Sequence, residues 1–259
     1  WAGAGTFTEG TSTLVMSGSS KKININANEV VNALTINGTI TINDITGIGR
    51  YIEPEDTFTV GGSGTLSSTG SEYLVFTNDY TGGSGQSKAL VIGNHANALA
   101  GLYKIRLAAS AGTLQIPQCT TPRIMNTDSG GTVQATGDLT ITTELEVSSG
   151  ATFTSNGNTI SAREVDINGL NATLILTNST LLLPYSSAAL RFEDNCILNA
   201  VEGATIQGLN SSNKAYLRCH PDMDAQVVGT LKWMQLEGGS HKTDITVIGS
   251  VVDCKFHAD

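Results

Sequence analysis

Short apolar segments recur along residues 131–183 at a regular spacing of about 20 residues. The segment ELEV at 144–147 aligns with EVDI at 164–167, and ATFT at 151–154 aligns with ATLI at 172–175. Apolar and polar side chains alternate within these segments, as in strands with one buried face. Such a period with short strands is typical of a β-solenoid, because one coil cannot bury its own apolar face and stacked coils form a continuous core.

Further matches extend the repeat, and one of them has a longer spacing than the others. Thr132-Val133 aligns with Thr152-Phe153, and Thr159-Ile160 aligns with Thr180-Leu181, at the same spacing. GATI at 203–206 echoes the segment that begins at Ala172, but after a longer interval, which we interpret as an inserted loop, PYSSAALRFED. LTINGTITI at 34–42 likewise aligns with ITVIGSVVD at 245–253, with a glycine at the bend of each.

The dipeptide Asn37-Gly38 is the main competing signal, because it favours a two-residue β-hairpin. A hairpin would place Ile36 opposite Thr39 and would mix apolar and polar residues on both faces. Without a hairpin, the even-numbered residues of 34–42 all lie on one face and are apolar or glycine. We therefore predict a strand that bends and continues into the next face of a coil.

The sequence as a whole predicts an all-β parallel β-helix with about 20–25 residues per coil and a few loop insertions. Residues 1–259 would form one elongated domain. The alternative is a boundary near 110–130, between an irregular N-terminal part and a regular C-terminal solenoid. In the N-terminal part, residues 81–113 lack a strand pattern, and 96–109 are expected to form a short helix or an irregular excursion.

Composition narrows the classes of partner. The net charge is −9 and the isoelectric point near 4.8, which argue against nucleic acid because phosphate binding needs clustered Lys and Arg. No apolar run approaches the roughly 18 residues that a membrane-spanning helix needs. The four cysteines are widely spaced without a C-x-x-C pair, so we expect buried free thiols and no zinc or redox cofactor.

Residues 5–43, GTFTEGTSTLVMSGSSKKININANEVVNALTINGTITIN, resemble Thr/Asn/Gly-rich repeats of phage structural and bacterial surface proteins. Such repeats occur in right-handed parallel β-helix proteins, which include phage tailspikes, surface adhesins and pectate-lyase-like enzymes. The resemblance implies a non-catalytic structural or receptor-interaction protein of a virion, such as a bacteriophage tail fibre, tailspike or capsid appendage. Its expected partners are other virion proteins, further copies in a homotrimer, and a cell-surface glycan. The alternatives are a polysaccharide-cleaving lyase or glycoside hydrolase, and a bacterial surface adhesin.

Asp222 and Asp224, close to His220, are the local candidates for catalysis in the enzyme alternative. On one strand their carboxyls would share a face at ~6.5–7 Å, a separation compatible with glycoside hydrolysis. Pro221 precedes them, so we favour an exposed acidic loop over a catalytic pair.

Two further acidic groups are candidate cation sites. Glu144 with Glu146 and Glu164 with Asp166 would stack on one outward face, where like charges lie unfavourably close unless a cation or a neighbouring subunit bridges them. We favour a solvated face over a cation site there. EPED at 53–56 offers oxygen ligands for Ca²⁺, with an acidic turn as the favoured alternative.

Aromatic residues near the C-terminus form one more candidate surface. Tyr216, Trp233 and Phe256 would provide a platform for sugars or a subunit contact, although filling or capping the core is the commoner use of such residues.

Overall fold

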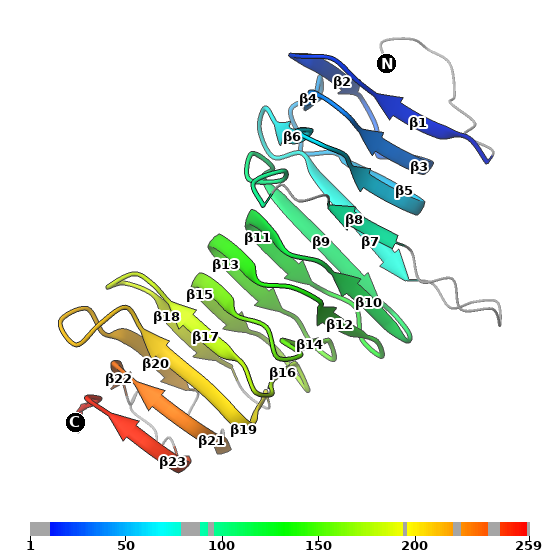
Figure 1. Cartoon of the computed structure of the whole chain (residues 1–259). Coiled ribbons are helices and arrows are strands. Elements are labelled where there is room, and N and C mark those ends of the chain that lie inside the picture. Colours follow the sequence, from blue (N-terminus) through cyan, green and yellow to red (C-terminus); the bar gives the residue numbers. More distant parts are fainter. Residues whose placement is uncertain are drawn as a thin grey trace.

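The computed structural model describes residues 11–78, 89–92, 96–193, 196–219, 224–237 and 244–257. Across these ranges the chain forms a right-handed parallel β-solenoid of about ten coils, each of roughly 21 residues, and contains no helix (Figure 1). The predicted fold class and coil length are therefore confirmed. In particular, none of the described segments is a helix long and apolar enough to cross a membrane.

The strands follow one another around the coils. The first third contains β1 Thr13–Met16, β2 Lys21–Ile25, β3 Glu29–Ile36, β4 Thr39–Asp44, β5 Tyr51–Val60, β6 Thr65–Ser68, β7 Tyr73–Asn78 and β8 Ala89–Ile92. The middle contains β9 Lys104–Ala109, β10 Thr113–Ile116, β11 Cys119–Asn126, β12 Thr132–Ala135, β13 Leu139–Val147, β14 Thr152–Thr154, β15 Ile160–Ile167 and β16 Thr173–Leu176. The last third contains β17 Thr180–Leu183, β18 Ala189–Phe192, β19 Ile197–Gly208, β20 Ala215–Cys219, β21 Asp224–Lys232, β22 Met234–Glu237, β23 Asp244–Val252 and β24 Lys255–His257.

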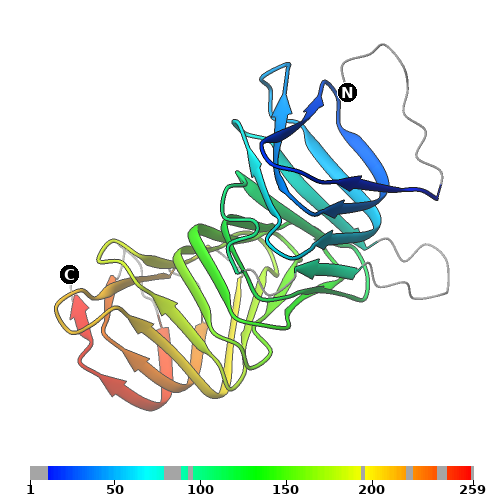
Figure 2. The same ribbon diagram turned by 45° about the horizontal axis from the view of Figure 1, so that its top comes forward.

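Each coil has three faces, and each face pairs in parallel with the same face of the next coil. In one regular coil, β14 forms the first face, residues 160–162 of β15 the second and residues 164–167 of β15 the third. Figure 2 shows successive coils lying over one another around a common interior. Alternate side chains fill this interior, and Phe153 and Leu174, partners on the first face, are both fully buried.

The register confirms the alignments made across residues 131–183. Glu144 pairs with Glu164 and Thr152 with Thr173, as the repeat predicts. The hairpin at Asn37-Gly38 is absent, as predicted. Instead, β3 pairs with β1 and β5, while β4 pairs with β2 and β6.

Close backbone approach explains the glycine at the predicted bend. A Cβ on Gly38 would lie 2.0 Å from the carbonyl oxygen of Gly18 in the preceding coil. Gly249 repeats the arrangement at the other end of the stack, where a Cβ would lie 2.0 Å from the carbonyl oxygen of Gly229. Any larger residue would push two neighbouring coils apart, so the bend requires glycine.

Residues 81–113 differ from the prediction, because they contain β8, β9 and the start of β10. Residues 96–109 are not a helix: a run of turns leads into β9. These turns occupy the second face of their coil, where the Ala98 carbonyl accepts from the Leu66 amide at 2.8 Å and the Leu99 side chain is buried. Tertiary pairing with β6 thus overrides the local helical preference of an Ala- and Leu-rich segment. The predicted loop at 82–85 lies outside the described residues.

The expected insertion at PYSSAALRFED is correct only for the first part of the segment. Leu182 pairs with Ser161 and Ala189 with Glu164, so residues 183–188 stand where the preceding coil has only residues 162 and 163. The second part is not a loop but β18, a regular third-face strand in which Leu190 pairs with Val165. Ala204 therefore does not correspond to Ala172. It precedes Thr205, which pairs with Thr180 on the second face.

No break in pairing occurs at the alternative domain boundary among the described residues. The ladders β9–β11, β10–β12 and β11–β13 all cross residues 110–130. The single elongated domain stays a prediction.

Candidate functional site

The third face carries two columns of outward side chains, one residue per coil, which we call the third-face ladder. Its first column contains Tyr51, Tyr73, Lys104, Arg123, Glu144, Glu164, Ala189, Tyr216, Gln235 and Lys255. Its second column contains Val75, Arg106, Met125, Glu146, Asp166, Arg191 and Arg218. The charges are therefore segregated: basic residues flank a central acidic segment on both sides.

The central acidic segment is the predicted quartet, and its stacking is confirmed. Glu144 pairs with Glu164, and Glu146 with Asp166, on adjacent coils. Arg123 closes one end, with Nη2 2.8 Å from Glu144 Oε2 and 2.7 Å from Glu146 Oε2. At the other end Arg191 forms an ion pair with Glu164.

The quartet is thus not a simple solvated face, because two arginines of the neighbouring coils pair with three of its four carboxylates. Burial raises the pKa of Glu144, Arg123 opposes this rise, and the neighbouring carboxylates add to it. Burial also raises the pKa of Asp166, and the negative charge of Glu193 raises it further. No group of three or more His, Cys, Asp or Glu residues placed to hold a metal ion occurs within the described ranges.

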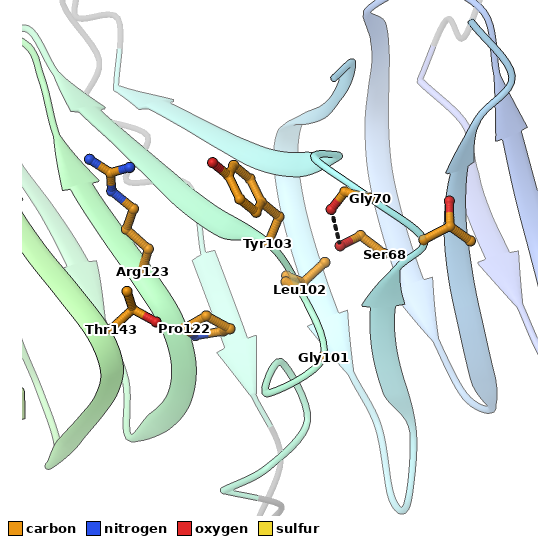
Figure 3. Close-up of a pocket in the computed structure, with 9 residues that line it drawn as sticks. Ser68, Gly70, Gly101, Leu102, Tyr103, Pro122, Arg123 and Thr143 are labelled. Atoms are coloured by element: carbon orange, nitrogen blue, oxygen red, sulfur yellow. Dashed lines mark hydrogen bonds between the residues drawn. The ribbon is translucent and has the colours of Figure 1, made fainter. Parts of the chain in front are cut away.

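A groove of about 340 Å³ lies beside the basic end of the quartet, at the corner between the second and third faces (Figure 3). Four successive coils line it with Ser68, Thr69, Gly70, Gly101, Leu102, Tyr103, Pro122, Arg123 and Thr143. Figure 3 shows the side chains of Tyr103 and Arg123 extending in the same direction from neighbouring coils. The groove therefore combines an aromatic ring, a guanidinium and several hydroxyls.

Aromatic and cationic side chains continue from this groove toward the N-terminal coils. Lys104 Nζ lies 4.3 Å from the ring centroid of Tyr73 and 5.7 Å from that of Tyr103. The rings of Tyr73 and Tyr51 are 5.5 Å apart, centroid to centroid, on adjacent coils. Cation–π contact holds the ammonium group over this outward surface.

The predicted Ca²⁺ candidate at 53–56 lies in β5 and not in an acidic turn, which corrects the favoured alternative. Pro54 is buried and pairs with Val31, while Glu55 and Asp56 are exposed where the strand bends. The Glu53 carboxylate accepts a hydrogen bond from Thr77 Oγ1 of β7 at 2.5 Å. The run is therefore extended and does not gather its carboxylates around one point.

The predicted catalytic pair, Asp222 with Asp224, is only partly described. Asp222 lies outside the described residues, and Asp224 begins β21, where its backbone pairs with Asp244. The role of Asp222 and Asp224 stays a prediction.

Asp44 and Glu72 form a buried acidic corner that no sequence pattern indicated. The Asp44 carboxylate accepts hydrogen bonds from the amides of Thr46, Ile48 and Gly49 at 2.8–2.9 Å, and from Thr46 Oγ1 at 2.6 Å. Burial opposes the ionised form, but these four bonds outweigh it and lower the pKa of Asp44 to about 2. The carboxylate thus organises residues 45–49 in the same way as an Asx turn.

One coil later, the Glu72 carboxylate likewise accepts hydrogen bonds from backbone amides and a hydroxyl. Its Oε1 accepts from the Asp44 amide at 2.8 Å and from Thr69 Oγ1 at 3.0 Å, and its Oε2 accepts from the Gly70 amide at 2.6 Å. Burial opposes ionisation of Glu72 as well, and the hydrogen bonds again lower its pKa. Both carboxylates have structural partners, so this corner is not a catalytic candidate.

The thiols agree with the sequence prediction where they are described. Cys119 is buried and free, and Cys254 is half-buried and free. Cys196 is buried, and its Sγ lies 3.1 Å from the carbonyl oxygen of Ile167 and 3.2 Å from that of Gly169. Burial raises the pKa of Cys119 to about 12, so it stays protonated at neutral pH. Such thiols pack as small apolar groups.

The predicted C-terminal aromatic platform is only partly described, and its role stays a prediction. Tyr216 lies on the third face with the Arg218 guanidinium 4.9 Å from its ring centroid. Trp233 lies at the following corner, with Lys232 Nζ 3.8 Å from its ring centroid. Each half-buried ring is thus covered by its own cation, and the side chain of Phe256 lies outside the description.

Tyr103 and Arg123 were missed as site residues, although the sequence contains a signal for one of them. Extending the repeat one coil backward aligns RIMN at 123–126 with ELEV at 144–147, as the observed register does. That alignment places Arg123 beside Glu144. Comparison with protein families, with curated proteins and with solved structures finds no match to this chain.

Proposed function

We propose that this chain is a non-catalytic structural and receptor-interaction segment of a virion, as in phage tail fibres, tailspikes or capsid appendages. The observation that carries the proposal is the continuous parallel stack of coils from β1 to β24, which forms a rod with β1 and β23 at opposite ends (Figure 1). Parallel pairing between coils makes such a rod rigid, and its end coils need a partner to prevent edge-to-edge aggregation. The expected partners are further copies in a homotrimer and neighbouring virion proteins.

Sedimentation equilibrium of the purified chain tests this proposal. A species near three times the chain mass of 27.0 kDa supports a trimeric appendage. A monomer over the whole accessible concentration range contradicts self-assembly by this segment. A bacterial surface adhesin would then be the better assignment for a rod that binds receptors.

A polysaccharide-cleaving enzyme is the second candidate, favoured by the position of Glu144 and Glu146. Both carboxylates contact the same nitrogen of Arg123, so they face a common point at the edge of the groove. A carboxyl with a raised pKa beside a second carboxylate is the arrangement that glycoside hydrolases use. The ion pairs with Arg123 oppose this role, because they occupy the oxygens that would have to reach a substrate.

A screen of acidic and neutral polysaccharides for new reducing ends or unsaturated products separates the two candidates. Wild-type protein should show no turnover. If turnover occurs, Glu144→Gln should abolish it while Glu164→Gln, one coil away from the groove, retains it. That pattern would overturn the non-catalytic proposal.

A further inference from the structure

The groove at the second and third faces is bordered by a group of three residues, Tyr103, Lys104 and Arg123, which we call the Tyr103 cluster. Tyr103 is 43% exposed, which is unusual for an aromatic side chain in a molecule whose other large apolar groups mostly fill the core. Arg123 lines the groove, and Lys104, which follows Tyr103 in the chain, is the first residue of β9. The cluster is thus a built surface of one ring and two cations around a concave site.

Lys104 is the cation of the Tyr103 cluster that no described carboxylate compensates, whereas Arg123 is paired with Glu144 and Glu146. No Asp or Glu of the described residues lies within ion-pair distance of Lys104. The Nε of Arg123 is buried and has no hydrogen-bond partner in the described part of the chain. Burial lowers the pKa of Lys104, and the charges of Arg123 and Arg106 lower it further against the opposing charge of Glu146.

Within the described ranges, Lys104 is thus a cation without a paired carboxylate at the edge of the groove, and it favours a ligand with an anionic group. The volume of about 340 Å³ is at the small end of ~300–1,000 Å³ for small-molecule sites, so it accommodates one or two rings. Its hydroxyls, from Ser68, Thr69 and Thr143, suit a ligand with many hydroxyls of its own. The ring of Tyr103 suits a ligand with an apolar face.

We propose that the groove and the Tyr103 cluster bind an anionic sugar residue. In this arrangement the carboxylate or sulfate group of the sugar lies against Lys104, next to the ion-paired Arg123, and the sugar ring packs on Tyr103. The inference rests on the proposed receptor-interaction function and assigns it a site and a ligand class. Tyr73 and Tyr51 extend the surface by one ring per coil, at 5.5 Å between those two centroids, so that a longer anionic glycan could continue along the ladder.

Isothermal titration of the full chain tests the site with four probes. These are a glucuronate-containing tetrasaccharide, the same tetrasaccharide with its carboxyls reduced, a sulfated disaccharide and a hexamer of glutamate. We expect the uronate or the sulfated sugar to bind at least about tenfold more tightly than the reduced sugar, since a charge-assisted hydrogen bond is worth ~1.5–3 kcal/mol. Which of the two binds identifies the source of the anionic group.

Matched variants then locate the site. Lys104→Gln and Tyr103→Ala should each weaken binding by about fivefold or more, with unchanged unfolding midpoints. The control is Tyr185→Ala, because Tyr185 is 45% exposed with Arg163 6.0 Å from its ring but does not line the groove. This control should bind like wild type.

The inference is overturned by no binding of either anionic sugar at millimolar concentration, by equal affinity for the reduced sugar, or by equal loss of binding in Tyr185→Ala. Binding of the glutamate hexamer as tight as that of the sugars would reassign the groove to an acidic protein segment and also overturn it. Self-association is measured separately, so a trimer without sugar binding retains the structural proposal and rejects only this site.

Discussion

Asp44 with Glu72 and Glu144 with Asp166 are two acidic regions on one solenoid, and they are stabilised in opposite ways. In the corner formed by Asp44 and Glu72, burial is opposed by backbone amides and hydroxyls, and the pKa of each carboxyl falls. On the third-face ladder, burial and neighbouring carboxylates raise the pKa of Glu144 and Asp166 despite the arginines. An ionised carboxylate therefore stabilises the fold at the corner and destabilises it on the third-face ladder.

The difference lies in where a solenoid has free N–H groups. Along a face, each amide already pairs with the next coil, so an outward carboxylate finds only side chains. At a corner, the chain leaves the ladder and its amides turn toward a nearby acceptor, as those of Ile48 and Gly49 turn toward Asp44. Corners can hold a carboxylate by backbone alone, whereas faces need arginine from a neighbouring coil.

Removing the corner carboxylate should have the largest effect. Glu72→Ala leaves the amides of Asp44 and Gly70 without their acceptor, and we expect a loss of about 3 kcal/mol in the free energy of unfolding. Urea denaturation followed by circular dichroism measures it. Glu55→Ala, at an exposed position of β5, is the control and should change stability by less than about 0.5 kcal/mol. Equal effects of both variants would contradict a special role for the corner.

Removing an arginine from the ladder should have a smaller effect. Arg123→Met leaves Glu144 and Glu146 facing each other, and we expect a loss of about 1–2 kcal/mol because the side chains are only partly exposed. Arg191→Met breaks a single ion pair, with Glu164, which is more exposed than those of Arg123. We expect it to lower the free energy of unfolding by about 0.5 kcal/mol. Denaturant midpoints of the two variants, compared at low and high salt, check this order. A larger loss in Arg191→Met would reject the bridging role of Arg123.

Acid should affect the two regions in opposite directions. Asp44 and Glu72 have lowered pKa values in the folded state, so their contribution is complete above the ordinary carboxyl pKa values of 3.8 and 4.5. It is lost as pH falls below the lowered pKa of each group, which is about 2 for Asp44. Glu72→Gln should therefore flatten the fall of stability between about pH 5 and pH 2 relative to wild type. Unfolding midpoints over this range test it, and parallel profiles would show that the lowered pKa of Glu72 does not contribute to acid unfolding.

Neutralising the ladder carboxylates should have the smallest effect, of opposite sign. Glu144 and Asp166 have raised pKa values, so their penalty appears as pH rises above the ordinary carboxyl range and is complete at pH 7. The double variant Glu144→Gln, Asp166→Asn should gain a few tenths of a kcal/mol at pH 7 and nothing at about pH 3. A loss of stability at pH 7 would mean that the ion pair of Glu144 with Arg123 outweighs the penalty.

The pairing of neighbouring coils can be predicted where one coil resembles the next. ELEV at 144–147 and EVDI at 164–167 reveal the register because alternation and length are both preserved across one turn. The pairing cannot be predicted where coil length changes: Phe58 pairs with Leu90, across an interval much longer than one regular coil and without a regular pattern. Residues 96–103 replace a second-face strand with turns, and only their pairing with β6 reveals that they belong to the stack.

The sequence by itself determined the solenoid, the buried face of each strand and the stacking of the acidic quartet. These properties depend on a side-chain period of two and on nearly equal coil lengths, both of which are local features of the chain. Only the tertiary structure decided that Arg123 bridges two glutamates, that Tyr103 borders a groove and that Glu72 accepts from the Asp44 amide. The Glu72 contact joins corners of neighbouring coils, where coil length varies and no sequence pattern records the register. The repeat places Arg123 beside Glu144, but only the side-chain conformations decide that Arg123 also reaches Glu146.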